Sequence, residues 1–378
     1  MHYLDNAATT KPSEACCKAV LNAMTTDFGN PSSLYGLGID AENIINGSKK
    51  IIGGALGCEA QGLYFTSCAT ESSNTVIFGA AKNYGKRKKR LVTTAVEHPS
   101  VSAPFDELEK QGFEVIRIFP DENGKISAQD IFNAVDDNTF LVSCMYVDNE
   151  TGYILPVEKA FRMIKKKYPD CITHCDAVQA FMKLDVKAAA LNADCISVSG
   201  HKVHASKGIG ALYVKKGVRI APYILGGGQE KGFRSGTECV PLIAGFGASV
   251  KELSLTISER FEKTSELKNH LVKSLESCKG IHINSGDDCS PYVVSVTVEN
   301  IKSETLLHYL EAREIYVSSG SACSRGKKSS VLKAFRLPEK YLDSTIRVSF
   351  CEENDRSDVD AFVKEILNAQ RELCKIKQ

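Results

Sequence analysis

The sequence predicts an α/β fold: a large domain with a mostly parallel sheet between helices, followed by a smaller α+β domain at the C-terminus. Apolar strand-like runs alternate with helical patterns from about residue 60 to residue 225. The runs are apolar throughout, as in strands buried on both faces, and the segments between them are long enough for crossover helices. Because the pattern changes after about residue 250, we expect a large domain over residues 15–255 and a small domain over residues 256–378 together with residues 1–14.

Seven apolar runs are predicted as strands of the large domain, and a helix through Ala81 follows the first of them. In chain order they are LYFTS (63–67), LVTTAVEH (91–98), EVIRIF (114–119), TFLVSCMYV (139–147), CITHCDA (171–177), CISVSG (195–200) and GALYVKK (210–216). Residues 252–277 carry apolar side chains at mostly helical spacing, which predicts one long amphipathic helix into the small domain. That domain has three predicted strands and a final helix beginning near Ser357, the strands being YVVSVTV (292–298), EIYVSSG (314–320) and TIRVSF (345–350).

Composition bounds the class of protein. The chain has 378 residues, 43% of them hydrophobic, and its net charge of +1 gives no reason to expect nucleic acid or membrane-surface binding. The start, MHYLDNAATT, lacks the basic and apolar regions of a signal peptide, and no run approaches the roughly 18 apolar residues of a membrane span. The fourteen cysteines are scattered and form no C-x-x-C motif, so we expect a cytoplasmic protein with reduced thiols and no metal site.

Polar residues follow several of the predicted strands, where ligands collect in open α/β sheets. The stretch CATESSN (68–74) opens a helix after the first strand and suits a phosphate, although taken alone it favours ordinary capping by Ser67 or Thr70. His98 could stack on a ring or transfer a proton, or be a hydrogen-bonded loop residue. Asn149, after the fourth strand, could donate to a phenolate-type oxygen or simply form a turn.

The two most informative stretches are THCDAVQ (173–179) and SVSGHKVHASKGIG (197–210). Asp176 ends an apolar strand and needs a cationic partner, either a protonated pyridine nitrogen or a structural Arg or Lys. Lys202 lies beside apolar strands, which favour the neutral, nucleophilic amine that forms Schiff bases, unless it is a surface lysine. Ser199 and His201 could reach a phosphate. Together these are the parts that pyridoxal 5′-phosphate (PLP) requires, since an Asp keeps its ring nitrogen protonated.

Ten stretches then occur in an order that resembles the cysteine desulfurase family, in its NifS/IscS-like branch of the class V aminotransferase group. They are YLDNAATT (3–10), FGNPSSLYGLG (28–38), FTSCATES (65–72), EHPS (97–100), DNETG (148–152), HCDAVQ (174–179), SGHK (199–202), GGGQEKGFRSGT (226–237), SSGSACS (318–324) and STIRVS (344–349). The resemblance covers about residues 3–350 and implies the PLP-dependent transferase fold type I.

The resemblance implies roles for individual residues. Lys202 would hold PLP, Asp176 would pair with its pyridine nitrogen, and Gln179 with Asn149 would lie at its ring hydroxyl. His98 would stack on the ring and shuttle protons. The phosphate would be held by Ala69, Thr70, Ser199 and His201. Thr237 would reach the phosphate of the partner subunit, which implies a homodimer with shared sites.

The resemblance also implies the substrate side of the reaction. Arg347 would clamp the carboxylate of L-cysteine bidentately, and Asn30 would lie in the substrate-side loop. L-Cysteine would become L-alanine, with its sulfur moving to Cys323 as a persulfide. A sulfur-acceptor protein, either an iron–sulfur scaffold or a tRNA thiolation enzyme, would then receive that sulfur. Arg325, Lys327 and Lys328 follow Cys323, and such cations favour the reactive thiolate.

The chain departs from the family pattern at Cys68, Ser206 and Cys239, where glycine, proline and asparagine are usual, and in a shorter segment between Cys323 and Val331. The shorter segment implies different docking partners. Alternatives are a selenocysteine lyase or a related PLP-dependent C–S lyase, a catalytically silent scaffold, and a metal or redox sensor. The stretch SSGSAC favours sulfur transfer over a lyase, because it supplies a nucleophilic thiol.

Overall fold

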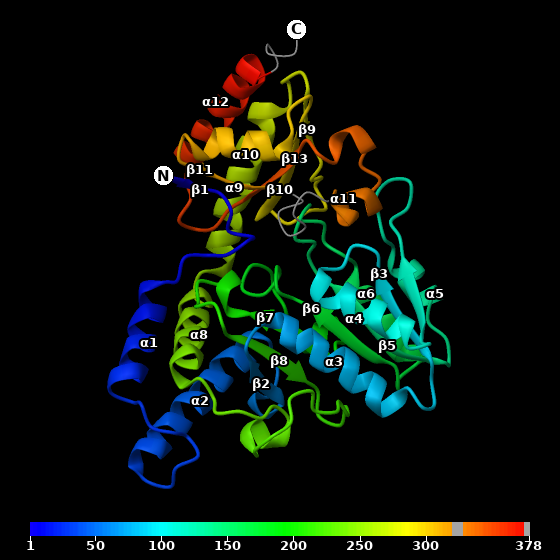
Figure 1. Cartoon of the computed structure of the whole chain (residues 1–378), viewed down its shortest axis with the longest axis vertical. Helices are drawn as coiled ribbons and strands as arrows, with labels where there is room; N and C mark the ends of the chain where they lie inside the picture. The colour runs from blue at the N-terminus through cyan, green and yellow to red at the C-terminus, as the bar shows by residue number, and fades with distance from the viewer. Residues whose placement is uncertain (320–327, 374–378) are drawn as a thin grey trace.

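The computed structural model describes residues 1–319 and 328–373, so Cys323, Arg325 and Lys327 lie outside the described residues. The large domain is built on a seven-stranded sheet in the order β2-β8-β7-β6-β5-β3-β4 (Figure 1). The strands are β2 (Leu63–Thr66), β3 (Arg90–Thr94), β4 (Glu114–Ile118), β5 (Thr139–Met145), β6 (Ile172–Asp176), β7 (Cys195–Ser199) and β8 (Gly210–Val214). Neighbours from β7 to β4 are parallel, and β8 runs antiparallel to both β2 and β7. The predicted mostly parallel sheet is therefore confirmed.

The sheet is buried on both faces, because successive side chains of one strand enter two different cores. In β5, Leu141 packs with Val76 and Phe105 of one helical layer, whereas Val142 packs with Ile164 and Phe246 of the other. The first layer holds α3 (Ala69–Tyr84) and α4 (Pro99–Lys110). The second holds α1 (Glu14–Thr25), α2 (Gly36–Ala55), α5 (Ala128–Asn133), α6 (Val157–Lys167), α7 (Ala188–Leu191) and α8 (Val240–Leu253). This two-sided burial explains why the strand sequences show no polar alternation.

The small domain has its own core, in which Leu271, Val296 and Phe362 are fully buried. Its four-stranded antiparallel sheet has the order β12-β13-β10-β9, and the N-terminal strand β1 (His2–Tyr3) pairs in parallel with β11 (Ile315–Tyr316) (Figure 1). Its other elements are α9 (Ile257–Leu275), β9 (Ile281–Ile283), β10 (Val293–Val298), α10 (Ser303–Glu311), β12 (Ser318–Ser319), α11 (Ser330–Ala334), β13 (Thr345–Ser349) and α12 (Arg356–Leu373). The pairing of β1 supports our proposal for the first of residues 1–14, whereas Thr10 and Ser13 donate their backbone N–H groups to the carbonyl oxygens of His201 and His204 in the large domain.

One of two predicted helix starts is wrong, and the other, near Ser357, is confirmed. The single helix expected over residues 252–277 is two helices, because α8 ends at Leu253, α9 begins at Ile257, and their axes differ by 75°. The final helix begins at Arg356, one residue before Ser357, because Asp355 accepts from the Ser357 backbone N–H while Asp358 accepts from that of Asp355. No single helix among the described residues is long and apolar enough to span a membrane; only the bent pair α8 and α9, taken together, passes by length and composition.

Candidate active site

Most of the predicted site residues lie at one edge of the large sheet, where the parallel strands end. Asp176 is the last residue of β6 and Ser199 the last of β7, and His98 and Asn149 follow β3 and β5. The small domain reaches this edge, because Arg347 of β13 donates from Nη1 to the backbone oxygen of Asn149 at 2.8 Å. The structure therefore brings the ends of these parallel strands and β13 of the small domain close together.

Lys202 ends the short 3₁₀ helix η2 (Gly200–Lys202), directly after β7. Its Nζ donates to the carbonyl oxygens of Ala7, at 2.5 Å, and Ala8, at 2.7 Å. The N-terminal segment thus passes against the lysine on its way from the small domain to the large one. These carbonyls hold the amine at the sheet edge rather than in solvent.

Asp176 is buried, and its Oδ1 accepts from the backbone N–H of Val178 at 3.0 Å. Burial raises its pKa to about 6, while the Val178 N–H and the charge of Lys202 oppose that rise. A carboxyl group in this state gains from a further cationic partner. Gln179 lies three residues later and is already engaged, because it donates to Ala7 O at 3.0 Å and accepts from Lys183 Nζ at 3.1 Å.

His98 is the N-cap of α4, and its Nδ1 accepts from the backbone N–H of Ser100 at 3.1 Å. Burial, together with the charges of Lys202 and Arg347, lowers its pKa to about 4. The ring is therefore neutral at pH 7. Since Nδ1 accepts, the proton of the neutral imidazole is on Nε2.

The start of α3 has the features of an anion site. Its N-cap Cys68 is extended, and no side chain among the described residues caps the helix. Ser67 does not cap it, because its hydroxyl and its N–H both donate to Glu71 Oε2, at 2.6 and 2.8 Å. The N–H groups of the first turn, which include those of Ala69 and Thr70, therefore remain available to a phosphate.

The other three predicted phosphate ligands are Ser199, His201 and Thr237. Ser199 and His201 lie in or next to η2, and His201 Nδ1 is 3.3 Å from Thr9 Oγ1. Thr237 is exposed, as a residue that serves a partner subunit would be in a single chain. Its segment is attached to α3 by Arg234, whose Nε donates to Glu71 Oε1 at 2.8 Å.

Arg347 and Asn149 carry buried polar atoms that have no partner among the described residues, namely Arg347 Nε and Asn149 Oδ1. The Nη2 of Arg347 donates to Asp5 Oδ1 at 3.0 Å and to Ser318 Oγ at 3.1 Å. Unpaired buried polar groups are rare in proteins and call for a ligand or water. A bound polar molecule or a water would therefore stabilise each of these two atoms.

The structure does not bring Asn30 to these residues within one chain. It lies exposed in the connection between α1 and α2, where its Oδ1 accepts from Ser32 N at 3.0 Å. That connection is at the end of the large domain opposite the small domain (Figure 1). Lys328, the last of the three cations after Cys323, pairs with exposed Glu339 at 3.0 Å.

Sequence reasoning missed three acidic residues at the site, of which Glu97 and Asp148 are buried and Glu150 is half-buried. Burial raises the pKa of both Glu97 and Glu150 to about 8, and it raises the pKa of Asp148 as well. Glu97 Oε1 accepts from Thr94 Oγ1 and the Met145 N–H. They could have been recognised from the sequence, because Glu97 directly precedes His98 and Asp148 and Glu150 lie on either side of Asn149.

Comparison with known proteins agrees with this arrangement. The profile of the family described as Aminotransferase class-V matches residues 2–362. The chain is 39% identical over 370 residues to a NifS/IcsS protein homolog of Lactobacillus delbrueckii subsp. bulgaricus, which covers 96% of this chain and 95% of that one. It is 38% identical to the cysteine desulfurase IscS of Methanosarcina thermophila, over 95% of this chain and 89% of that one.

Solved structures give the same result. A NifS-like protein superimposes with a TM-score of 0.92 at 35% identity, covering 98% of this chain and 99% of its own. A structure described as SspA in complex with cysteine has a TM-score of 0.82 at 33% identity, with 93% and 99% covered. The chain belongs to the aminotransferase class-V family and, within it, to the cysteine desulfurases of the NifS/IscS type.

Proposed function

We propose that the protein uses PLP to convert L-cysteine to L-alanine and retains the sulfur as a persulfide on Cys323. The observation that carries this proposal is the pair of unpartnered buried atoms, Arg347 Nε and Asn149 Oδ1, at the sheet edge that also holds Lys202 and Asp176. A polar ligand would satisfy both atoms, and an amino acid on a pyridine cofactor has groups of the right kind.

The residues present fit PLP. Lys202 would bind it covalently, Asp176 would pair with its ring nitrogen, and the first turn of α3 would hold its phosphate with Ser199 and His201. The close packing of β8 behind that turn supports this, because a Cβ on Gly210 would lie 3.0 Å from Ala69 N. When bound, PLP supplies an electron sink that weakens the bonds around the α-carbon of an amino acid.

The side chains of the chain itself then have distinct tasks. Arg347 would bind the substrate carboxylate, because its guanidinium group is fixed by Asp5 and Ser318 while its Nε is still unpaired among the described residues. His98 in its neutral form would stack on the cofactor ring and donate a hydrogen bond from Nε2, and it would pass a proton on only after taking one up. Cys323 would attack the substrate sulfur, so that an S–S bond forms while the C–S bond breaks and its electron pair goes to the carbon that becomes the methyl group of alanine.

The test is to measure alanine formation from L-cysteine and from L-selenocysteine for the wild type and Cys323→Ala. The proposal expects Cys323→Ala to lose most of its activity on L-cysteine while it retains bound PLP. Full cysteine activity in this variant, together with a strong preference for selenocysteine, would identify a lyase instead.

We further propose a homodimer with shared sites. Large apolar side chains are exposed around the end of α1 and the start of α2, namely Leu21, Met24, Phe28, Leu34, Tyr35, Leu37 and Ile39. Several large exposed apolar side chains within one short stretch of chain are typical of a protein–protein interface. Thr237 of one subunit would then reach the phosphate site of the other.

We also propose that the persulfide passes to an acceptor protein in the cytoplasm, either an iron–sulfur scaffold or a tRNA thiolation enzyme. The cysteines that the structure describes are free thiols, which supports a reducing compartment. Mass-spectrometric detection of the proteins that receive labelled sulfur from this enzyme would identify the acceptor. If no protein receives labelled sulfur, the proposed transfer is contradicted.

A further inference from the structure

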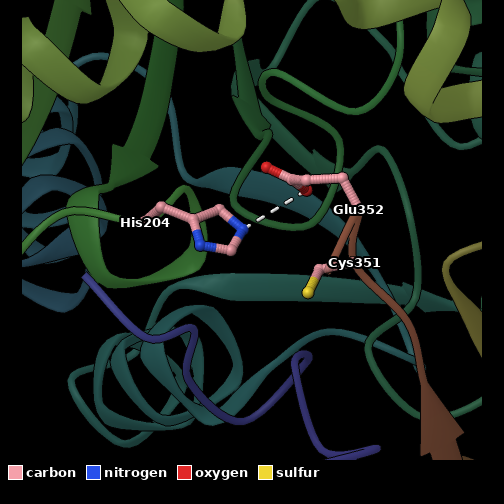
Figure 2. Close-up of side chains that lie close together, drawn as sticks. All are labelled: His204, Cys351 and Glu352. Atoms are coloured by element: carbon pink, nitrogen blue, oxygen red, sulfur yellow. Dashed lines mark ion pairs between the residues drawn. The ribbon is translucent and has the colours of Figure 1, made fainter. Parts of the chain in front are cut away.

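A cluster of three side chains lies behind Lys202, outside the site described above. His204 follows Lys202 by two residues, and Cys351 and Glu352 follow strand β13, which carries Arg347. Figure 2 shows the imidazole of His204 facing the Glu352 carboxylate, with the Cys351 sulfur beside them. One possible ligand atom of each residue lies within 4.8 Å of the other two, and His204 Nε2 is 3.4 Å from Glu352 Oε2.

The backbone of His204 is held in an uncommon conformation. Its φ of 56° is left-handed, which is costly for a residue with a side chain. Thr10 Oγ1 accepts from its N–H at 2.7 Å, and Ser249 Oγ donates to its carbonyl at 2.6 Å. These contacts fix the position from which the ring reaches the other two side chains.

The ring of His204 is also oriented. Its Nδ1 is 2.9 Å from the carbonyl oxygen of Lys11, and because a carbonyl can only accept, Nδ1 carries the proton in this contact. Nε2 therefore faces Cys351 and Glu352. Burial lowers the pKa of His204, but hydrogen bonds to Cys351 and Glu352 raise it to about 10, so a bound metal ion would replace the proton on Nε2. Histidines that bind metals are commonly oriented in this way, by a carbonyl or carboxylate at the other ring nitrogen.

The cluster has room for an ion and a route from solvent. All three residues line a small cavity of about 10 Å³, roughly the space that one water or ion needs. His204 and Glu352 also line an adjoining groove of about 750 Å³. Carboxylates outnumber cations on that groove, with Glu14, Glu252, Glu259, Glu352 and Glu353 against Lys11, Arg260 and Lys263.

We propose that His204, Cys351 and Glu352 bind a zinc ion, with the fourth position open to water. Nitrogen, thiolate and carboxylate donors are the set that zinc takes, whereas calcium and magnesium require mainly oxygen. Two ligands about 2.1 Å from a tetrahedral zinc ion lie about 3.4 Å apart, and the His204–Glu352 separation of 3.4 Å matches this. Lys183, Lys202 and Arg260 also line the small cavity, so the three ligands must outweigh the repulsion between these cations and the bound ion.

The proposed ion would join the two domains next to the catalytic edge. It would connect the segment that follows Lys202 to the segment that follows Arg347, and so fix the spacing between these residues. The role of the ion in spacing Lys202 and Arg347 rests on the proposed function. Metal binding does not, because it is measured without any catalytic reaction.

The test uses PLP-loaded full-length Cys323→Ala protein, so that the thiol of Cys323 does not bind metal. After treatment with a chelator, the protein is titrated with Zn²⁺, its metal content is measured, and Co²⁺ is then substituted to detect a cobalt–thiolate absorbance band. We expect one metal ion per chain. Adding Cys351→Ser should remove the band and weaken binding at least about tenfold, and Glu352→Gln should weaken binding but retain the band.

Cys17→Ser is the matched control, because Cys17 lines the outer groove but is not part of the cluster, and it should leave both readouts unchanged. If Cys351→Ser does not fold, the Glu352→Gln titration decides. Binding of less than one ion per chain, or a band that survives in Cys351→Ser, would overturn the proposal and leave His204 and Glu352 as an ion pair only.

Discussion

Arg347 has a guanidinium group that is almost fully buried, and each of its terminal nitrogens donates to a protein acceptor. Two of these acceptors, Asp5 and Ser318, belong to the small domain, and the third is the backbone of Asn149 in the large one. The planar fork makes these contacts at once and keeps Nε for a ligand. A lysine has the charge but not the geometry.

Arg347→Lys should therefore reduce kcat/KM for L-cysteine by about 10- to 100-fold, which corresponds to losing a charge-assisted hydrogen bond of about 1.5–3 kcal/mol. The loss should appear mainly in KM, because the carboxylate is bound throughout the reaction. Steady-state kinetics at saturating PLP measure it. An unchanged KM would show that Arg347 does not bind the substrate.

Glu97 gives a prediction about pH. Burial raises its pKa from 4.5 to about 8, so the folded protein holds a proton that the unfolded chain releases at lower pH. The stability that this group contributes is complete below pH 4.5 and is lost as the pH rises through 8. Glu97→Gln cannot ionise, so its stability relative to the wild type should rise over this range by a few kcal/mol.

Urea unfolding of both proteins at pH 5 and pH 8, at equal PLP loading, measures this difference. Exposed Glu122→Gln serves as the control and should show no such trend. A pH-independent difference between Glu97→Gln and the wild type would contradict the raised pKa.

At the scale of elements, the packing of β8 against the start of α3 shapes the phosphate end of the site. A Cβ on Gly210 would lie 2.7 Å from the carbonyl carbon of Cys68 and 3.0 Å from Ala69 N. Strand glycines often mark such close approaches of backbone. The N-terminal turn of α3 can take its observed position only because β8 has no side chain there.

Gly210→Ala should therefore displace the first turn of α3 and weaken PLP binding at least about tenfold, the effect of an overpacking strain of 1–3 kcal/mol. Absorbance titration with PLP measures it. Gly47→Ala is the matched control, because that helical glycine has no atom within 4 Å of an added Cβ, and it should leave PLP affinity unchanged. Equal affinity in Gly210→Ala would show that this turn does not hold the phosphate.

The sequence predicts elements well where burial alone determines them. Apolar runs become β5, β6 and β7 within two residues of the expected ends, because both faces of these strands are buried. The break between α8 and α9 was missed, because Leu253 and Ile257 keep helical spacing across it. Spacing cannot show a change in axis direction, which depends on what each helix packs against.

At the scale of the whole molecule, the site depends on segments distant in sequence. The predicted Lys202 and His98 follow strands of one sheet and Asp176 ends another of its strands, so strand order places them together. The contacts of Ala7 and Ala8 with Lys202 could not be predicted, because they depend on how the N-terminus joins the small domain. The same holds for His204 and Cys351, which no local motif connects.

The proposed dimer makes a prediction about mixed subunits. Lys202→Ala and Thr237→Asp should each be inactive alone, the second because its carboxylate repels the partner's phosphate. Mixed dimers, isolated with two affinity tags, should recover about half of the wild-type activity, because one of the two sites is then intact. Full activity of Thr237→Asp alone, or no recovery in the mixed dimer, would contradict a shared site.

The central claim is that Cys323 carries the sulfur, and the most direct measurement is peptide mass spectrometry after the PLP-loaded enzyme has reacted with L-cysteine. The account predicts that the Cys323 peptide gains the mass of one sulfur atom in the wild type, and that it gains none in Lys202→Ala. Alanine formation without added sulfur on Cys323, or with the sulfur on another cysteine, would contradict it.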